Sequence, residues 1–597
     1  MSVFFNGQLL VTPVTASAVN DDAMLNQNLS VGNNIGYVGI ANGGKPQEVY
    51  AFGTPDEARQ VLVSGELCDA VTAAFSPSEE TGSPQTVYAV RVNPSEPAKL
   101  VLPFADKAKG AFCTFVAKRY SAEDLLTKVT VEAGSKAGLF SLKVEGKTSG
   151  MPWTYEAEDF NASVMTITAL VSDAKFMIGE HNNEAGMSQG WPAVTVDPNG
   201  QWESIDLSQY QTIGELADYL NSKTDILGQN AFKVTFTNDD YRDLPITAFD
   251  AGHVAFTGAP DMVEWPMFRY GLDQFVLAHL SDVFDVEWPT GDGYLSRKDG
   301  PAAVTGQYFS RAVPVAPTVA DWESALHLME MQDLQWVQAV SGNDEIHAQI
   351  QAHVTVCSNV LHRERRSICG TQLATTDLDA LAKAKALNSK RISLVHIGHY
   401  AYDAAGKLAL RPAYMTAGLV AAAFAGVNPG TPLTNKTLAV RGLERDLRNP
   451  TDTDKLLKGG VMPIENTETG YKVTQSITTW LVDSKYNNRE QSCGVAVDFA
   501  IRNVRQAVDV LRGSKQSPIL LSRAVSLTKG TLTELSRPEP QGPAVLVGDE
   551  NSPAFRNVTA TIEGDVLRIQ FEASPAIPNN YILVTMYAVP YSGSATA

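Results

Sequence analysis

The sequence predicts a multidomain α/β and α+β protein with a mixed α/β core, an inserted β-rich domain, a small α+β carboxy-terminal domain and extended terminal arms. Three observations carry this prediction. Helical and strand patterns alternate before residue 94 and again after residue 254. Short strands separated by turn residues fill the interval between them. The last apolar strand, 581–589, has no later strand with which it could pair.

Length, charge and cysteine content limit the function classes. The 597 residues are enough for several domains, and no uninterrupted apolar run approaches the roughly 20 residues of a membrane-spanning helix. The net charge of −19 argues against a nucleic-acid partner, because phosphate binding needs clustered Lys and Arg. The cysteines are widely spaced without a Cys-x-x-Cys pair, which predicts buried free thiols in a reducing cytoplasm. They are Cys68, Cys113, Cys357, Cys369 and Cys493.

Residues 1–33 are expected to form an amino-terminal arm. The stretch 11–19 reads as extended chain, and Pro13 suits an edge strand but not a helix. A signal peptide is the competing interpretation. We reject it because residues 1–10 lack a basic region and a continuous apolar region, so we expect the segment to remain in the mature protein.

Residues 34–93 are expected to be the first part of the core. Residues 35–40 read as a buried strand, and Thr54 then begins a helix as its N-cap, with Pro55 at the first helical position and Glu57 completing a capping box. A second helix over about 66–75 leads to a strand over 86–92. This order of strand, helices and strand is typical of an α/β unit.

Residues 94–254 are expected to be the inserted, outward-facing β-rich domain. The predicted strands cover 128–133, 140–144, 154–158, 164–170 and 232–236. One helix interrupts them. Its capping box runs from Thr212 to Glu215, and Ile213, Leu216 and Leu220 form its inner face.

Residues 255–458 are expected to return to the core, because helical and strand patterns alternate again, and three of the predicted helices each precede a strand. The helices are 320–331, 343–362, 376–387 and the Ala-rich 413–425; the strands are 334–340, 366–370 and 392–396. This alternation predicts a mostly parallel or mixed sheet covered by helices.

Residues 459–580 are expected to be the carboxy-terminal α+β domain. Its main helix has a single predicted apolar stripe, with the pairs Asp498/Arg502 and Arg505/Asp509 pointing outward. The stripe consists of Val497, Ile501, Val504, Val508 and Leu511. A second helix over 518–535 precedes a hairpin over 558–571 that turns at Gly564-Asp565.

Residues 581–597 are expected to be the carboxy-terminal arm, and its strand is apolar on both faces. One face would carry Ile582, Val584, Met586 and Ala588, and the other Tyr581, Leu583, Thr585, Tyr587 and Val589. Such a strand can fold back into its own domain or add to the sheet of a neighbouring molecule. The second interpretation makes the protein a building block.

Several motifs could suggest catalysis or metal binding. The loop Gly39–Lys45 follows a strand and matches the start of a phosphate-binding loop, but Pro46 stands where Ser or Thr would hold magnesium. His396 and His399 could hold a metal, yet no third ligand lies beside them in the sequence. His347, His353 and His362 do not share one helix face. We therefore assign no catalytic, cofactor-binding or metal-binding residue.

The chain resembles the tail sheath proteins of contractile, myovirus-type phage tails. The resemblance rests on the order and spacing of several segments and covers most of the chain, least in the β-rich insertion. These segments are Arg365–Gly370, Ala384–Ser389 before Arg391–Val395, Tyr414–Gly426, Asn428–Thr434, Leu457–Val461 and Ser476–Trp480, together with Tyr37–Ala41 and the strand Val87–Asn93.

The resemblance implies a virion subunit, assembled in the host cytoplasm, that forms stacked hexameric rings around a tail tube and contracts to drive the tube through the host envelope. It implies the tail tube, baseplate and tail terminator proteins as partners, and no cofactor. It also implies that both arms add strands to neighbouring subunits. By position, the donated strands would include Val11, Val14 and Val19 and residues 582–589, and the acceptors would include Ile477, Thr479, Leu481, Val566 and Ile569.

Two further function classes stay open at this point. One is a nucleotide-binding enzyme that uses the Gly39–Lys45 loop. The other is a secreted or surface β-rich adhesin, which the missing signal peptide disfavours.

Overall fold

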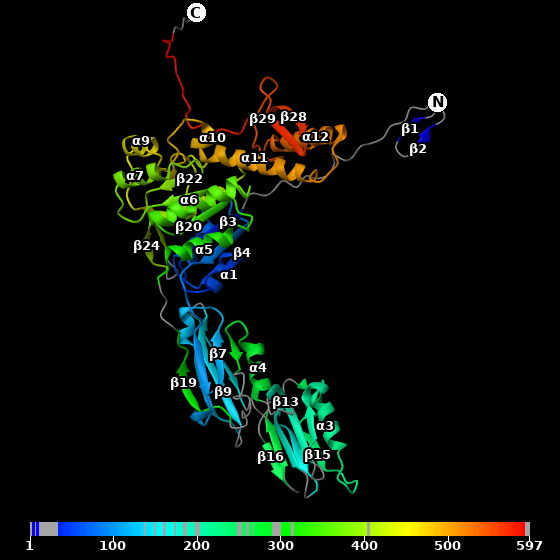
Figure 1. The fold of residues 1–597 in the computed structure, drawn as a ribbon. Helices are drawn as coiled ribbons and strands as arrows, with labels where there is room; N and C mark the ends of the chain where they lie inside the picture. The colour runs from blue at the N-terminus through cyan, green and yellow to red at the C-terminus, as the bar shows by residue number, and fades with distance from the viewer. Residues whose placement is uncertain are drawn as a thin grey trace, which may run out of the picture.

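The computed structural model describes most of the chain. The described residues are 3–5, 8–10, 34–135, 139–148, 151–158, 163–171, 175–182, 188–197, 203–246, 254–257, 262–266, 268–288, 300–311, 316–402 and 406–591. They form an α/β core, an elongated β-rich part to one side of it and a carboxy-terminal domain to the other (Figure 1). The predicted fold class is confirmed.

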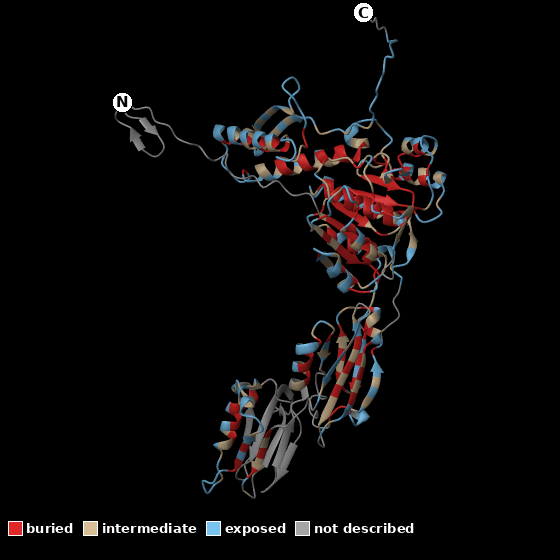
Figure 2. Ribbon diagram, turned by 180° about the vertical axis from the view of Figure 1, so that it is seen from behind, coloured by how far each residue is buried: buried red, intermediate tan, exposed pale blue. Residues whose placement is uncertain are grey.

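A mostly parallel sheet forms the centre of the core. Its strands are β3 (Asn34–Gly39), β4 (Val49–Phe52), β5 (Thr86–Arg91), β20 (Trp336–Ala339), β21 (Ser367–Gly370) and β22 (Ile392–Val395). Strand β3 pairs in parallel with β5 and β20, β21 pairs in parallel with β22, and β4 is the antiparallel edge. A parallel bridge between Trp336 and Arg366 joins the two sets of strands. The apolar runs of these strands are buried, as expected where helices cover both faces (Figure 2).

The helices that cover this sheet include the one predicted to begin at Thr54. They are α1 (Pro55–Leu62), α2 (Glu66–Ala74), α5 (Val319–Met329), α6 (Asp344–Asn359), α7 (Asp377–Leu387), α8 (Ala413–Ala425) and α9 (Thr451–Lys458). The Thr54 side chain accepts a hydrogen bond from the Glu57 amide at 3.4 Å, with Pro55 next to it. Helix α8 is buried on nearly all sides, and Gly418 lies against the ring of Tyr37, whose hydroxyl donates to the Gly418 carbonyl.

Small antiparallel elements complete the core. They are β23 (His399–Tyr402), β24 (Leu408–Arg411), β25 (Gly442–Leu443), β26 (Ile464–Thr467) and β27 (Gly470–Val473). At the amino end, β1 (Val3–Phe5) pairs with β2 (Gln8–Leu10). The predicted donor residues Val11, Val14 and Val19 lie outside the described residues.

The β-rich part consists of two units with separate cores. The first contains β6 (Lys99–Pro103), β7 (Ala111–Ala117), β8 (Lys128–Ala133), β9 (Phe140–Thr148), β10 (Met151–Ala157), β18 (Phe284–Glu287), β19 (Val304–Tyr308) and α4 (Phe268–His279). The second contains β11 (Ser163–Ala169), β12 (Lys175–Asn182), β13 (Ser188–Asp197), β14 (Glu203–Asp206), β15 (Phe232–Phe236), β16 (Val254–Thr257), β17 (Met262–Pro266) and α3 (Ile213–Asn221). Figure 1 shows them one beyond the other below the core.

The predicted end of the insertion at residue 254 is wrong, because later strands still pair with strands of the β-rich part. Strand β18 pairs with β7, and β19 pairs with β8. The entry and exit chains then meet, since the amides of Lys99 and Ser310 each donate to the other residue's carbonyl, at 2.7 and 2.9 Å. The insertion therefore runs from about residue 94 to about residue 311.

The carboxy-terminal domain packs two long helices against a hairpin. It contains α10 (Tyr486–Arg489), α11 (Gln491–Asp509), α12 (Pro518–Leu535), β28 (Phe555–Glu563) and β29 (Val566–Ala573).

Within the part of the chain that the structure describes, no helix combines the length and the apolar character needed to span a bilayer. All five cysteines are buried, as predicted, and none forms a disulfide with another described residue.

Candidate assembly surfaces

The hairpin β28–β29 is a two-stranded sheet with both outer edges unpaired among the described residues. Gly564, at φ +61°, forms the turn, as predicted. The inner face packs on α11 and α12 through Val558, Ala560, Ile562, Leu567, Ile569 and Phe571. The outer face is exposed, and Val566, at 49% exposure, lies on it. An unpaired edge beside an apolar inner face is a ready template for a further strand.

The carboxy-terminal arm pairs with no strand among the described residues of its own molecule. Residues 581–591 form neither helix nor strand, and they extend away from the body (Figures 1 and 2). Its large apolar side chains are 81–97% exposed: Tyr581, Ile582, Leu583, Val584, Met586, Tyr587, Val589 and Tyr591. Thr585 lies among them. Because residues from both alternating faces are exposed together, the arm buries neither face within one chain.

The expected strand over 477–482 is absent, which corrects the prediction. Ile477 and Thr479 are buried, and the segment runs as irregular chain beside the core. Its backbone amides already donate within the molecule. The Thr479 amide donates to the Ile392 carbonyl at 2.8 Å, and the Leu481 amide donates to Asn388 Oδ1 at 3.0 Å. These two positions have no amide left for an added strand.

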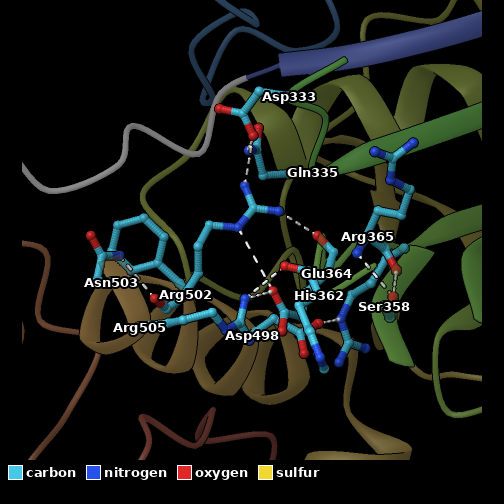
Figure 3. Close-up of polar contacts among 12 residues, drawn as sticks. Asp333, Gln335, Ser358, His362, Glu364, Arg365, Asp498, Arg502, Asn503 and Arg505 are labelled. Atoms are coloured by element: carbon cyan, nitrogen blue, oxygen red, sulfur yellow. Dashed lines mark hydrogen bonds and ion pairs between the residues drawn. The ribbon is translucent and has the colours of Figure 1, made fainter. Parts of the chain in front are cut away.

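Helix α11 is oriented differently from the prediction. The apolar face that packs on α12 and the hairpin carries Ala496, Phe499, Ala500 and Val504. Val497 and Ile501 are instead 38% and 39% exposed. Asp498, Arg502 and Arg505, which were expected to point outward, face the α/β core (Figure 3). The predicted stripe failed because its members divide between a buried face and an exposed one.

The charged face of α11 binds the core through ion pairs. Asp498 Oδ2 lies 2.7 Å from Arg366 Nε and 2.7 Å from Arg391 Nη1, and Asp498 Oδ1 lies 3.0 Å from Arg391 Nη2. All three side chains are at most 15% exposed. Burial alone would raise the pKa of Asp498, but the two guanidinium groups outweigh burial and lower it. Removal of the Asp498 carboxylate would therefore leave the two guanidinium groups buried without a countercharge.

A second cluster extends the junction (Figure 3). Glu364 Oε2 accepts from Arg505 Nη1 at 3.1 Å, and Arg502 donates to the Glu364 carbonyl at 2.6 Å. Arg502 also pairs with Asp333 at 3.0 Å. Asp333 and Glu364 lie in the segments just before β20 and β21, so α11 contacts the chain where two strands of the core sheet begin. The junction joins the carboxy-terminal domain to the core.

The loop Gly39–Lys45 does not form a phosphate cradle. The amides of Asn42, Gly44 and Lys45 already donate to Ser64, Arg119 and Tyr50 within the chain. No helix follows the loop directly, because β4 does. A hollow of about 340 Å³ at the carboxyl edge of the sheet contains the Glu66 carboxylate, and its lining includes neither Lys nor Arg. This setting repels phosphate.

The predicted histidine pair is not brought together as a metal site. His396 Nε2 lies 3.0 Å from Asp377 Oδ1, whereas His399 Nδ1 lies 2.8 Å from Thr416 Oγ1. Another group of possible ligands, Glu330, His353 and Cys357, lies close together. There the Arg365 guanidinium contacts His353 Nε2 at 3.1 Å and donates to the Met329 carbonyl at 3.0 Å. The Arg365 guanidinium thus lies beside His353, where a metal ion would have to bind, and it caps the carboxyl end of α5.

Burial of histidines predicts a loss of stability in mild acid. Burial lowers the pKa of His353 to about 3 and that of His399 to about 4, with a smaller contribution from a nearby arginine in each case. An unfolded histidine binds a proton below pH about 6.5, whereas these two stay neutral when folded, so stability rises with pH between those values. Each of the two histidines should lower the free energy of unfolding by about 2 kcal/mol as the pH falls from 6.5 to 5.

Urea unfolding at pH 7.5 and pH 5 measures this effect. We expect His399→Gln to reduce the difference between the two pH values. An equal pH dependence in the wild type and in His399→Gln would contradict the assignment.

Comparisons with known proteins agree with the resemblance seen in the sequence. The chain is 26% identical over its full length to the tail sheath protein of Bacillus phage SP01, of which the alignment covers 98%. It is 20% identical to the tail sheath protein of Staphylococcus phage Twort, over 78% of this chain and 80% of that protein. No model of a known protein family matches the chain.

Solved structures show the same fold. A sheath tail protein from Desulfitobacterium hafniense aligns over 94% of this chain and 96% of its own length, with a TM-score of 0.53 and 11% identity. A sheath tail protein from Listeria innocua aligns with a TM-score of 0.51 and 11% identity, over 93% and 94% of the two chains. The matches confirm the resemblance to tail sheath proteins.

Proposed function

We propose that this chain, a homologue of phage tail sheath proteins, is the structural subunit of a contractile tail sheath. Subunits form stacked hexameric rings around a tail tube, contact the baseplate and the tail terminator, and shorten to drive the tube through the host envelope. The subunits assemble in the host cytoplasm. It has no catalytic step.

One observation carries the proposal: the apolar arm after Asn580 is exposed, the outer edges of the hairpin β28–β29 are unpaired, and the two do not pair with each other among the described residues. The arm of one copy adds as a strand to the hairpin of another, so that one arm face packs over α11 and α12. Each backbone hydrogen bond nets on the order of 1 kcal/mol, so four to eight bonds give roughly 4 to 8 kcal/mol before the cost of ordering the arm.

The assembled sheath gains from the number of such junctions. A single junction is modest, but a subunit that donates and receives arms is held at several points at once. Contraction then needs no fuel at the moment of firing. The extended sheath is a trapped, less stable state, and new contacts between cores release the difference on shortening while the strand junctions persist.

Proline substitutions in the arm test strand addition directly. An added strand directs alternate amides toward its acceptor, so one of the neighbouring positions Val584 and Thr585 must donate a hydrogen bond there. Val584→Pro and Thr585→Pro each remove one amide, and neither residue supports the folded monomer. We expect one of the two variants to prevent tube formation in negative-stain micrographs, at a concentration where the wild type forms tubes.

Val584→Ile and Thr585→Val serve as controls, because they keep the amide and the apolar character of the arm. We expect both to form tubes. Normal tubes from both proline variants would exclude strand addition by this arm.

A further inference from the structure

The carboxy-terminal arm leaves the body at a fixed point, which we call the arm anchor: Thr434, Glu490 and Asn580. Thr434 Oγ1 donates to Asn580 Oδ1 at 3.2 Å, and Asn580 Nδ2 donates to Glu490 Oε2 at 3.4 Å. Glu490 is 2% exposed and also accepts a hydrogen bond from Ser476 Oγ at 2.6 Å. The last residue before the arm is thus bound to a buried carboxylate next to the first turn of α11.

A short strap, residues 574–576, turns the chain away from the hairpin before it reaches the anchor. The Val547 amide donates to the Ser574 carbonyl at 2.9 Å, and the Ala576 amide donates to the Val545 carbonyl at 2.9 Å. In Figure 1 the chain accordingly runs from β29 to the α10 end of α11, where the arm departs. No hydrogen bond joins residues 581–591 to the rest of the described chain.

The path of the chain is not the one that topology favours. Consecutive strands usually pair, and the seven residues 574–580 between β29 and the arm are enough for a loop. The outer edge of β29 is open, and the arm has apolar residues for the face that would pack on α11 and α12. An unrestrained arm would therefore fold back as the third strand of its own sheet.

Self-completion would compete strongly with assembly. A segment tethered by a short linker faces its own hairpin at an effective concentration in the millimolar range, far above that of subunits in dilute solution. A subunit that closed its own edge would offer neither a free arm nor a free acceptor. Assembly by arm exchange thus requires something that holds the arm away.

We infer that the arm anchor and the strap prevent self-completion and reserve the open edge of the hairpin for the arm of a second copy. This inference rests on the proposed function. The Asn580 side chain is the positioning element, because it fixes where the arm begins without taking part in the junction itself.

Asn580→Ala tests the inference, with Asn579→Ala as a matched control whose side chain makes none of the anchor contacts. The full-length monomer is treated with chymotrypsin, which cuts after Tyr581 and Tyr587 while the arm is exposed. Loss of the two hydrogen bonds should raise the equilibrium constant for pairing of the arm with its own hairpin about tenfold. We expect Asn580→Ala to be cut several-fold more slowly and to form fewer tubes, whereas Asn579→Ala matches the wild type.

Thr434→Val removes one of the two bonds and should give a smaller effect in the same direction. The inference is overturned if chymotrypsin cuts Asn580→Ala as fast as the wild type, or if Asn580→Ala forms as many tubes as the wild type. That outcome is distinguishable from failure of the proposed function, because a chain lacking residues 581–597 would still fail to form tubes.

Discussion

Deletion of residues 581–597 should leave a folded monomer that forms no long tubes. The arm makes no hydrogen bond with the rest of the described chain, so its loss removes no stabilising contact from the α/β core or from the hairpin β28–β29. The proposed sheath, in contrast, would lose a donated strand at every junction. Because junctions act together, the loss multiplies along the tube and should abolish assembly.

On the same preparation, negative-stain microscopy measures tube formation and urea unfolding measures the stability of the monomer. The midpoint of unfolding should match that of the full chain, which separates failed assembly from failed folding. Replacing residues 592–597 alone with a Gly-Ser segment is the matched control and should leave tubes intact. Normal tubes from the truncated chain would refute the role of this arm.

Asp498→Asn should destabilise the protein by about 3 to 5 kcal/mol, because it leaves Arg366 and Arg391 buried without a countercharge. Asp509→Asn is the control on the same helix. Asp509 pairs with Arg512 on the exposed surface, and such pairs contribute about 1 kcal/mol or less. The measurement is the free energy of unfolding in urea at pH 7.

The pH dependence gives Asp498→Asn a second signature. Because the folded pKa of Asp498 is lowered, its contribution is present above the unfolded value of about 3.9 and is lost as the pH falls through the folded value. The difference between Asp498→Asn and the wild type should therefore persist from pH 7 to about pH 5 and shrink in stronger acid. Equal stability of the two proteins at pH 7 would show that the junction contributes nothing.

The sequence predicts local structure well because the signals are local. Thr54 and Thr212 cap their helices as expected, since a cap depends on residues three positions apart. The core strands were found because buried parallel strands read as continuous apolar runs. The end of the insertion was missed because β18 pairs with β7, about 170 residues earlier, and no pattern around residue 284 indicates that partner.

The same limit applies to the assembly surfaces. The arm was predicted from an apolar run between Pro578 and Pro590, and the hairpin from a turn at Gly564-Asp565; both are short-range features. The partners of Asp498 lie 132 and 107 residues away, and a charge four positions from another charge suggested an exposed pair instead. The anchor residues Thr434, Glu490 and Asn580 have no distinguishing sequence pattern, since their role arises only where three distant segments meet.

The mutual hydrogen bonds of Lys99 and Ser310 give the β-rich insertion adjoining ends. A module with adjoining ends can be cut out, replaced or enlarged by recombination without changing the path of the surrounding polypeptide. The insertion can therefore differ between related proteins while the α/β core around it keeps its fold.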